Sequence, residues 1–235
     1  MNSYLRILTA NLFSGRADPA ALGELIEELE VDIVCVQELG PRIAEPLSRL
    51  LPGGELGSGE IARGLGIACR HDAVVRQFSL PKRDGWVARL SPTSWSQIDE
   101  PIEIVNVHIM APHTWPYFPR RLTRHGQLSS LIRFLDDDPH VPRAILGDFN
   151  ASPVWPLYRR LASKLTDAAV EGMRGGPGRH LTWPHLPSIG LKGIFQIDHC
   201  FLSNLTATNV QVVAIPGSDH LGLCVDVMAN KRDPG

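Results

Sequence analysis

The stretch Ala144-Ile145-Leu146-Gly147-Asp148-Phe149-Asn150 joins a short apolar strand to a polar loop. Two other runs have the same character. The apolar, β-branched segment 31–36 leads into Gln37-Glu38, and Ser218-Asp219-His220 stands directly before a further apolar segment. Polar side chains at strand ends lie in loops held by a rigid sheet, where binding and catalytic residues are usually found. We therefore expect these separate runs to meet at one edge of the fold.

Length and composition indicate one globular domain covering residues 1–235. Hydrophobic residues make up 43% and charged residues 20% of the chain. These proportions are typical of a folded protein and not of a disordered one. The formal net charge of −2 argues against a strongly basic surface for coating nucleic acid. A local arginine cluster could still contact phosphates, so the net charge leaves the substrate class open.

The start of the chain has no basic segment followed by a long apolar one, and no later apolar run approaches the ~18 residues needed to span a bilayer. We expect a cytoplasmic protein without stable membrane insertion, although the mature form of a cleaved precursor would look the same. The four cysteines lie in apolar, strand-like segments and no two are at CxxC spacing, which predicts buried free thiols. They are Cys35, Cys69, Cys200 and Cys224.

The pattern of apolar residues predicts strands that often follow one another closely, with occasional helices between them. Strands are expected at residues 5–10, 31–36, 65–70, 73–80, 86–90, 102–108, 144–146, 195–202, 210–215 and 222–227. Helices are expected at 19–29, 42–51, 121–135 and 153–161. Asp18-Pro19 and Ser152-Pro153 are the expected starts of the first and last helix. The glycines at 53, 54, 57 and 59 predict a flexible loop. This order favours an α/β (α+β) fold in which two mostly antiparallel sheets pack face to face with helices outside.

The residues able to carry chemistry are spread over most of the chain, so only the fold can bring them together. They are Asn11, Glu38, His108, Asp148, Asn150, Asp198, Asp219 and His220. Several have an ordinary structural explanation when taken alone. Asn and Asp favour turns, and a single histidine is more often a core or rim residue than a catalyst. Asp198 is different, because a carboxylate inside an apolar run needs a partner if it is buried.

Taken together, six elements resemble the endonuclease/exonuclease/phosphatase superfamily, whose members include deoxyribonuclease I, exonuclease III and neutral sphingomyelinases. The elements, in the order of that family, are Asn11, Gln37-Glu38, Asn106-Val107-His108, Gly147-Asp148-Phe149-Asn150, Ile197-Asp198-His199 and Ser218-Asp219-His220. The resemblance covers nearly the whole chain. It implies a four-layer α/β sandwich around two mixed sheets, and a metal-dependent phosphodiesterase activity.

The residue types suit that chemistry. A phosphodiester is an anion, so attack by water needs a cation to neutralise the charge that develops on the phosphorane oxygens and the leaving group. Mg²⁺ prefers oxygen ligands, and Mn²⁺ is the expected substitute. The resemblance implies that Glu38 is the principal metal ligand, with Asn11 and Asp219 as further contacts.

A neutral imidazole paired with a carboxylate can accept the proton of the attacking water. The resemblance assigns this role to His220 with Asp198, and it places Asp148 and Asn150 beside the scissile phosphate. It also implies that His108 donates to the phosphate or the leaving oxygen. Repair endonucleases of the family tend to carry tyrosine at that position, so the histidine disfavours an abasic-site enzyme.

Other residues are candidates for substrate contact. Arg124 could meet substrate phosphates, since guanidinium groups bind phosphate oxygens, but a solvated helix start explains it equally well. Glu60 is a suggestive acidic partner for His108. The residues that could wall a pocket or stack bases are Trp115, Tyr117, Trp155, Trp183 and His185.

These observations favour a Mg²⁺-dependent phosphodiesterase, by first preference a monomeric nuclease acting on DNA. The alternative substrate is a lipid or small-molecule phosphoester, as in the sphingomyelinases. A catalytically inactive binding domain is the third interpretation.

Overall fold

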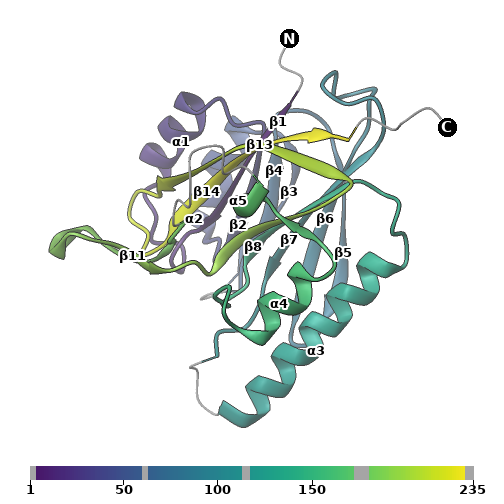
Figure 1. Ribbon diagram of the computed structural model, residues 1–235. Coiled ribbons are helices and arrows are strands. Elements are labelled where there is room, and N and C mark those ends of the chain that lie inside the picture. The colour runs from purple at the N-terminus through teal and green to yellow at the C-terminus, as the bar shows by residue number, and fades with distance from the viewer. Residues whose placement is uncertain (1–3, 60–62, 113–116, 172–179, 231–235) are drawn as a thin grey trace.

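Two six-stranded β-sheets pack face to face in the computed structural model, with helices on their outer faces (Figure 1). The structure describes residues 4–59, 63–112, 117–171 and 180–230. The first sheet has the order β13 (Leu205–Ala214), β14 (Leu221–Ala229), β1 (Leu5–Asn11), β2 (Ile33–Gln37), β4 (Leu65–Cys69) and β3 (Gly53–Gly57). The second has the order β5 (Val74–Leu80), β6 (Arg83–Leu90), β7 (Ile102–His108), β8 (Arg143–Asp148), β12 (Asp198–Ser203) and β9 (Thr166–Asp167).

Each sheet is mixed, because one parallel pair stands among antiparallel ones. The parallel pairs are β1 with β2 and β7 with β8. This confirms the predicted four-layer sandwich of two mostly antiparallel sheets. The parallel pairs matter for function, since strands that run the same way deliver their last residues to the same edge of a sheet.

Helices α1 (Pro19–Glu28) and α2 (Pro41–Leu50) cover the first sheet, and α3 (Tyr117–Asp136) and α4 (Pro156–Ala162) cover the second (Figure 1). The short elements are α5 (Ala168–Glu171), the 3-10 turn η1 (Pro187–Ile189), and a projecting hairpin of β10 (Trp183–Leu186) and β11 (Leu191–Phe195). Asp18 caps α1 as predicted, accepting from the N–H groups of Ala20 and Ala21. Among the described helices, none combines the length and apolar character that crossing a membrane requires.

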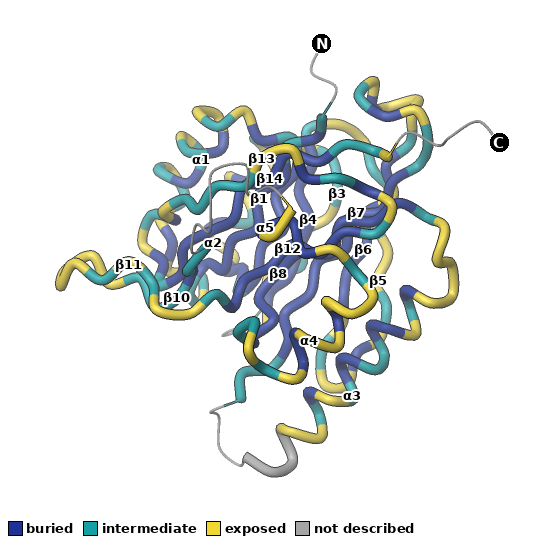
Figure 2. The backbone as a smooth tube through the Cα atoms, in the orientation of Figure 1, coloured by how far each residue is buried: buried dark blue, intermediate teal, exposed yellow. Residues whose placement is uncertain are grey.

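Apolar residues form one core between the sheets and one under each pair of helices. The central strands of both sheets are almost entirely buried, whereas the edge strand β5 and the hairpin are largely exposed (Figure 2). All four cysteines are buried and free, which confirms that prediction.

A buried polar bridge joins the two sheets close to the ends of β2 and β7. The side-chain amide of Gln37 donates to Asn106 Oδ1 at 2.7 Å and to Thr9 Oγ1 at 3.1 Å. Asn106 Nδ2 donates in turn to the carbonyls of Val36 and Gly66. Satisfied polar networks in a low-dielectric interior specify one arrangement of their partners. This bridge therefore fixes the strand ends from which Glu38 and His108 emerge.

Three local predictions were wrong. Residues 53–57 form the edge strand β3 instead of a flexible loop, because their glycines let the chain pair closely with β4. A Cβ at Gly54, where φ is +86°, would stand 2.2 Å from the Ile67 carbonyl oxygen. The last predicted helix begins at Pro156 and not at Pro153, since Ser152 instead forms a turn in which its carbonyl accepts from the Trp155 N–H. The predicted strand 195–202 is divided between β11 and β12, which pair with different partners.

Candidate active site

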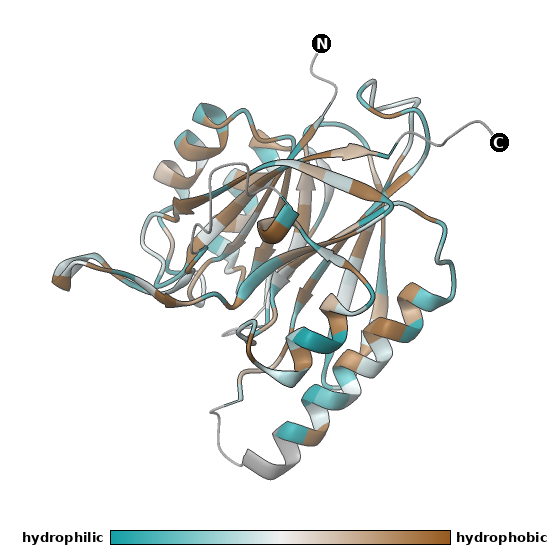
Figure 3. Cartoon of the chain, in the orientation of Figure 1, coloured by the Kyte–Doolittle hydropathy of each residue, from teal (hydrophilic) through white to brown (hydrophobic). Residues whose placement is uncertain are grey.

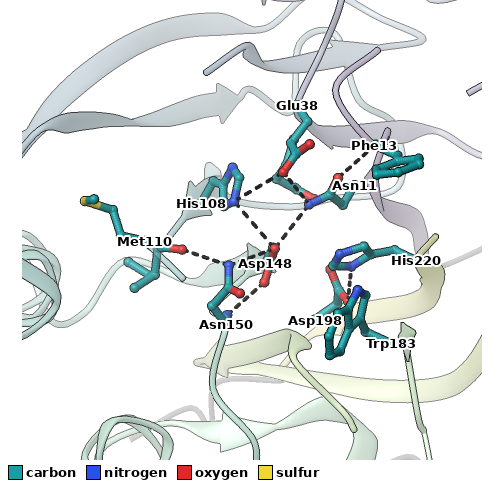
Figure 4. Close-up of polar contacts among 12 residues, drawn as sticks. Asn11, Phe13, Glu38, His108, Met110, Asp148, Asn150, Trp183, Asp198 and His220 are labelled. Carbon is teal, nitrogen blue, oxygen red and sulfur yellow. Dashed lines mark hydrogen bonds and ion pairs between the residues drawn. The ribbon is translucent and has the colours of Figure 1, made fainter. Parts of the chain in front are cut away.

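Asn11 and Glu38 come from the neighbouring parallel strands β1 and β2. Glu38 has a φ of +55°, and its Oε2 accepts hydrogen bonds from the Ser14 N–H and hydroxyl. Asn11 Nδ2 lies 3.5 Å from Glu38 Oε1 and 3.1 Å from Asp148 Oδ2, while its Oδ1 accepts from the Phe13 N–H at 3.0 Å. Asn11 thus joins the carboxylates of the two sheets (Figure 4).

His108 and Asp148 come from the second parallel pair, where they are register partners. His108 Nε2 is 3.5 Å from Asp148 Oδ2 and 3.9 Å from Glu38 Oε1. Burial, helped by the positive charges of Arg83 and His220, lowers the pKa of His108 well below its ordinary value. The imidazole is therefore neutral at pH 7.

The end of β8 and the turn after it are shaped by two residues of positive φ. Gly147 has a φ of +139°, and a Cβ there would stand 1.9 Å from the Val107 carbonyl oxygen, so only glycine fits. Asn150 has a φ of +49°. Its N–H donates to Asp148 Oδ1 at 2.8 Å, and its Nδ2 donates to Asp148 Oδ2 and to the Ile109 carbonyl, both at 3.0 Å. Asp148 and Asn150 consequently act as one rigid unit.

Asp198 begins β12 beside Asp148, and its Oδ2 lies 2.9 Å from His220 Nδ1. The His220 N–H donates to Ser218 Oγ, which itself donates to the Asn11 carbonyl. Burial by itself lowers the pKa of His220, but the charges of Asp198 and Asp148 and the bond to Asp198 raise it to about 10. The Nδ1 contact leaves Nε2 as the nitrogen able to exchange a proton with a bound molecule.

Asp148 lies in surroundings with an excess of negative charge. Burial first, and then the neighbouring Asp198 carboxylate, raise the pKa of Asp148 to about 7. Asp148, Asp198 and His220 place potential ligand atoms within 4.8 Å of one another. A divalent cation beside these carboxylates would offset their repulsion, and the donors on the Glu38 side are oxygens, which Mg²⁺ prefers. The residues present therefore fit a hard divalent metal ion.

A cavity of about 380 Å³ unites most of the predicted residues. Glu38, His108, Asp148, Asn150, Asp219 and His220 line it. In Figure 4, Asp148 stands between Glu38 and His108 on one side and the Asp198–His220 pair on the other. Asn11 and Asp198 are buried beside the cavity, in contact with its lining residues.

Arg124 does not face this cavity. Its buried guanidinium donates to the carbonyl oxygens of Met110 and Asn150. The side chain therefore holds the backbone on both sides of the site instead of presenting its fork to a substrate. Two other candidates cannot be placed, since Glu60 and Trp115 lie outside the described residues, as does the side chain of Tyr117.

Several lining residues were not foreseen from the sequence. They are Phe13, Ser14, Arg83, Phe195 and Ile197, together with Ala111 and Pro112. Trp155 and Trp183 do wall the cavity, and Trp183 Nε1 donates to Asp219 Oδ2 at 3.3 Å. Ile197 directly precedes Asp198 and Phe195 stands three residues before it, so their closeness to a candidate residue was a usable signal. Arg83 follows a tight turn between two strands, where its local sequence carries no such signal.

Comparisons with known proteins agree with this geometry. The model of the endonuclease/exonuclease/phosphatase family matches residues 8–220. The human nocturnin catalytic domain with bound sulfate is 20% identical, with a TM-score of 0.74 over 98% of this chain and 96% of that chain. TDP2 of D. rerio, complexed with a single-strand DNA product, is 16% identical, with a TM-score of 0.73 over 98% and 100%. A Bacteroides thetaiotaomicron mannosyl-6-phosphatase is 15% identical, with a TM-score of 0.70 over 95% and 99%.

These structural likenesses show a shared fold, and no curated protein matches the chain in sequence. The family match extends over nearly the whole sandwich and includes every residue of the candidate site. The chain therefore belongs to the endonuclease/exonuclease/phosphatase family, a family of phosphoester hydrolases.

Proposed function

We propose that this protein hydrolyses phosphodiesters by metal-assisted attack of water, with DNA as the first candidate substrate. The observation that carries the proposal is that two sets of polar residues meet at one cavity. An imidazole paired with a carboxylate, His220 with Asp198, lies on one side of Asp148. Glu38 and a neutral histidine, His108, lie on the other. This combination supplies an acid–base group, a metal ligand and a hydrogen-bond donor around one phosphorus atom.

The metal ligands in this proposal are oxygens. Glu38 is the principal ligand, Asp219 is a second, and the Asn11 amide oxygen can contribute the lone pair that the Phe13 N–H leaves unused. Bound Mg²⁺ would neutralise charge that develops on the phosphate oxygens and the leaving group.

His220 accepts the proton of the attacking water at Nε2, while Asp198 holds Nδ1 and stabilises the imidazolium that forms. The pKa of about 10 is partly due to the charges of Asp148 and Asp219. A cation held beside these carboxylates would offset their charge and lower the pKa of His220, so that the imidazole could act as a base near neutral pH.

Asn150 and His108 act on the substrate from the side opposite His220, and Asp148 lies between the two sides. Asp148 orients the attacking water, and the Asn150 amide and His108 imidazole donate to the phosphate or the leaving oxygen. Asn150 Nδ2 reaches the phosphate by exchanging its bond to the Ile109 carbonyl. All three residues line the cavity.

Two observations support a nucleic-acid strand as the substrate. The D. rerio TDP2 structure of the same fold holds a single-strand DNA product. The aromatic side chains of Phe13, Trp155, Trp183 and Phe195 line the cavity here, and aromatic rings stack bases without regard to sequence. Unpaired bases beside the scissile phosphate would fit these walls.

A lipid phosphodiester is the second candidate, and the β10–β11 hairpin favours it. Leu186, Ile189 and Ile194 on this hairpin are 40%, 73% and 53% exposed. Phe195, at its base, is 43% exposed and also lines the cavity. Exposed apolar residues thus lie on the projecting hairpin, with Phe195 at the cavity, and exposed apolar patches commonly mark binding surfaces (Figure 3 shows the hydropathy of the hairpin).

Turnover of a single-stranded oligonucleotide, a duplex, sphingomyelin vesicles and bis(p-nitrophenyl) phosphate tests the proposal. We expect hydrolysis with Mg²⁺ or Mn²⁺ that stops with EDTA, and faster cleavage of DNA than of lipid. Ile189→Ser should leave DNA cleavage unchanged, whereas it should slow vesicle hydrolysis if lipid is the substrate. No metal-dependent turnover of any phosphodiester would overturn the proposal in favour of a binding domain.

A further inference from the structure

A second histidine–carboxylate pair is buried behind the first. His199 follows Asp198 on β12 and therefore points to the opposite face of the sheet. It is 0% exposed, and its Nδ1 lies 3.6 Å from Asp167 Oδ2. The chemistry proposed above does not use this pair. Burying an imidazole and a carboxylate costs free energy unless both are hydrogen-bonded. The hydrogen-bond partners of His199 and Asp167 therefore indicate the role of the pair.

The Nε2 atom of His199 reaches the active-site turn. It lies 2.7 Å from the carbonyl oxygen of Ala151, the residue directly after Asn150. A carbonyl oxygen can only accept a hydrogen bond, so Nε2 carries the hydrogen. Nδ1 lies 3.1 Å from the side-chain amide nitrogen of Gln196. This arrangement directs the Nε2 donor at the active-site backbone.

The Asp167 carboxylate, on the Nδ1 side of His199, is itself held by two hydrogen bonds. Asp167 Oδ2 accepts from the Tyr158 hydroxyl at 2.6 Å, and Asp167 Oδ1 accepts from the Ala169 N–H at 2.9 Å. Although burial raises the pKa of Asp167, its contacts with His199 and Tyr158 hold it below the ordinary value, so the group is a carboxylate at neutral pH. Asp167 is thus an anion of fixed position that orients the His199 ring.

Aromatic rings enclose His199 and restrict it to one orientation. Phe201 stacks on it with centroids 5.5 Å apart, Tyr158 is tilted at 4.9 Å, and Phe149 meets it edge-on at 5.8 Å. Phe149 lies inside the active-site turn, between Asp148 and Asn150. The imidazole therefore contacts this turn twice, through the Phe149 ring and through the Ala151 carbonyl.

The turn needs such support because its backbone is strained. Asn150 has a φ of +49°, in the left-handed region where a residue other than glycine is strained. Its geometry brings the Asn150 N–H and side chain onto Asp148. Arg124 holds the Asn150 carbonyl, and His199 holds the next one. Released at Ala151, the turn could relax and separate Asp148 from Asn150.

We propose that His199, oriented by Asp167 and Tyr158, is a positioning residue that holds the Asp148–Asn150 turn in its reactive geometry through the Ala151 carbonyl. The effect on turnover rests on the proposed function, whereas the effect on the backbone does not. Displacements of about 1 Å in a catalytic group can cost about 100-fold in rate. Loss of the His199 donor should therefore lower kcat more than it alters KM.

Two substitutions separate hydrogen bonding from packing. His199→Phe keeps an aromatic ring between Phe149, Tyr158 and Phe201 but removes the donor to the Ala151 carbonyl. His199→Gln removes the ring, while its amide nitrogen can occupy the place of Nε2 and restore the donor. We expect kcat of the phenylalanine variant to fall about 10- to 100-fold with KM within about threefold, and the glutamine variant to stay within about threefold of wild type in both.

The reverse order, with His199→Phe active and His199→Gln impaired, would overturn the proposal and leave His199 as a packing residue. Equal activity of both variants would overturn it too. If His199→Phe does not fold, His199→Asn serves in its place, because its shorter amide falls short of Ala151.

Amide hydrogen exchange at Asn150 provides a readout independent of turnover. The exchange of this N–H, which is bonded to Asp148 Oδ1, should accelerate at least about tenfold in His199→Phe or His199→Asn and remain near wild type in His199→Gln. A wild-type protein without turnover would contradict the proposed function alone. Unchanged exchange in all variants would contradict the positioning role.

Discussion

The two histidine–carboxylate pairs on opposite faces of β12 are alike in chemistry and differ in what surrounds them. His220, paired with Asp198, lines a cavity and is surrounded by further carboxylates. His199, beside Asp167, is enclosed by aromatic rings and bonded to a backbone carbonyl. One imidazole can meet a substrate and the other cannot. The comparison teaches that two features decide the role of a histidine–carboxylate pair: whether the imidazole is open to a cavity, and what its Nε2 atom contacts. An Nε2 that faces a cavity can transfer protons, whereas one bonded to a carbonyl holds the backbone.

Removal of the His220 imidazole should have the largest effect. In His220→Asn, the amide nitrogen can keep the contact with Asp198 but Nε2 is lost, so kcat should fall about 10²- to 10⁴-fold. Steady-state kinetics with Mg²⁺ measures this. His125→Ala, at an exposed position of α3, is the control and should match wild type. A His220 variant that retains most of its kcat would break the comparison, because neither imidazole would then be catalytic.

Glu38→Gln should act on metal binding instead of proton transfer. Its amide preserves the shape and can still accept from Ser14, but it lacks the negative charge. We expect Mg²⁺ affinity to fall about 10- to 100-fold in calorimetric titration, with the fold intact. Glu45→Gln, on the exposed face of α2, should leave the affinity unchanged. Equal Mg²⁺ affinities in wild type and Glu38→Gln would place the ion elsewhere, with the Asp148, Asp198 and His220 cluster as the next site to test.

The stabilities of the two pairs should depend on pH in opposite directions in metal-free protein. The pKa of His220 is raised to about 10, so its contribution is complete below about pH 6.5 and is lost as the pH rises through 10. Urea unfolding in EDTA should show the stability advantage of wild type over His220→Asn shrinking between pH 7 and 9, by at most about 1.4 kcal/mol per pH unit. A gap that widens over this range would contradict the assignment.

Asp167 provides the other half of that test. Its pKa is lowered, so the stabilisation is present above about pH 4 and is lost as the pH falls through the lowered value. The advantage of wild type over Asp167→Asn should therefore be constant from pH 6 to 8 and decrease below pH 4.

Tyr158→Phe should have the smallest effect, because it removes one hydroxyl at the far end of the buried chain of contacts. Loss of a hydrogen bond to a carboxylate predicts a decrease of about 1–2 kcal/mol in the free energy of unfolding. The fall in kcat should be smaller than in His199→Phe, since the bond to Ala151 persists. Urea unfolding and steady-state kinetics check this. The control is Ser163→Ala, at an exposed position just after α4, which should change the free energy of unfolding by less than about 0.5 kcal/mol. A larger loss of kcat than in His199→Phe would place the positioning function at Tyr158.

Some features could not be predicted from sequence because they depend on partners far along the chain. The glycine-rich residues 53–57 are a strand only because β4 offers a paired edge. Arg124 resembled a phosphate-binding residue, yet two carbonyls from separate loops surround its guanidinium. Arg83 enters the cavity wall through the pairing of β5 with β6. Local pattern carries no information on such encounters.

The sequence by itself determined the alternating strands, the cap of α1, the free cysteines and the identity of the chemical groups, because these follow from local periodicity and residue type. Only the tertiary structure decided which groups meet. Two parallel strand pairs bring Asn11 beside Glu38 and His108 beside Asp148, and antiparallel β12 adds Asp198 from one face and His199 from the other. The physical reason is that catalysis and positioning depend on distances of a few ångströms, which strand register sets and sequence separation does not.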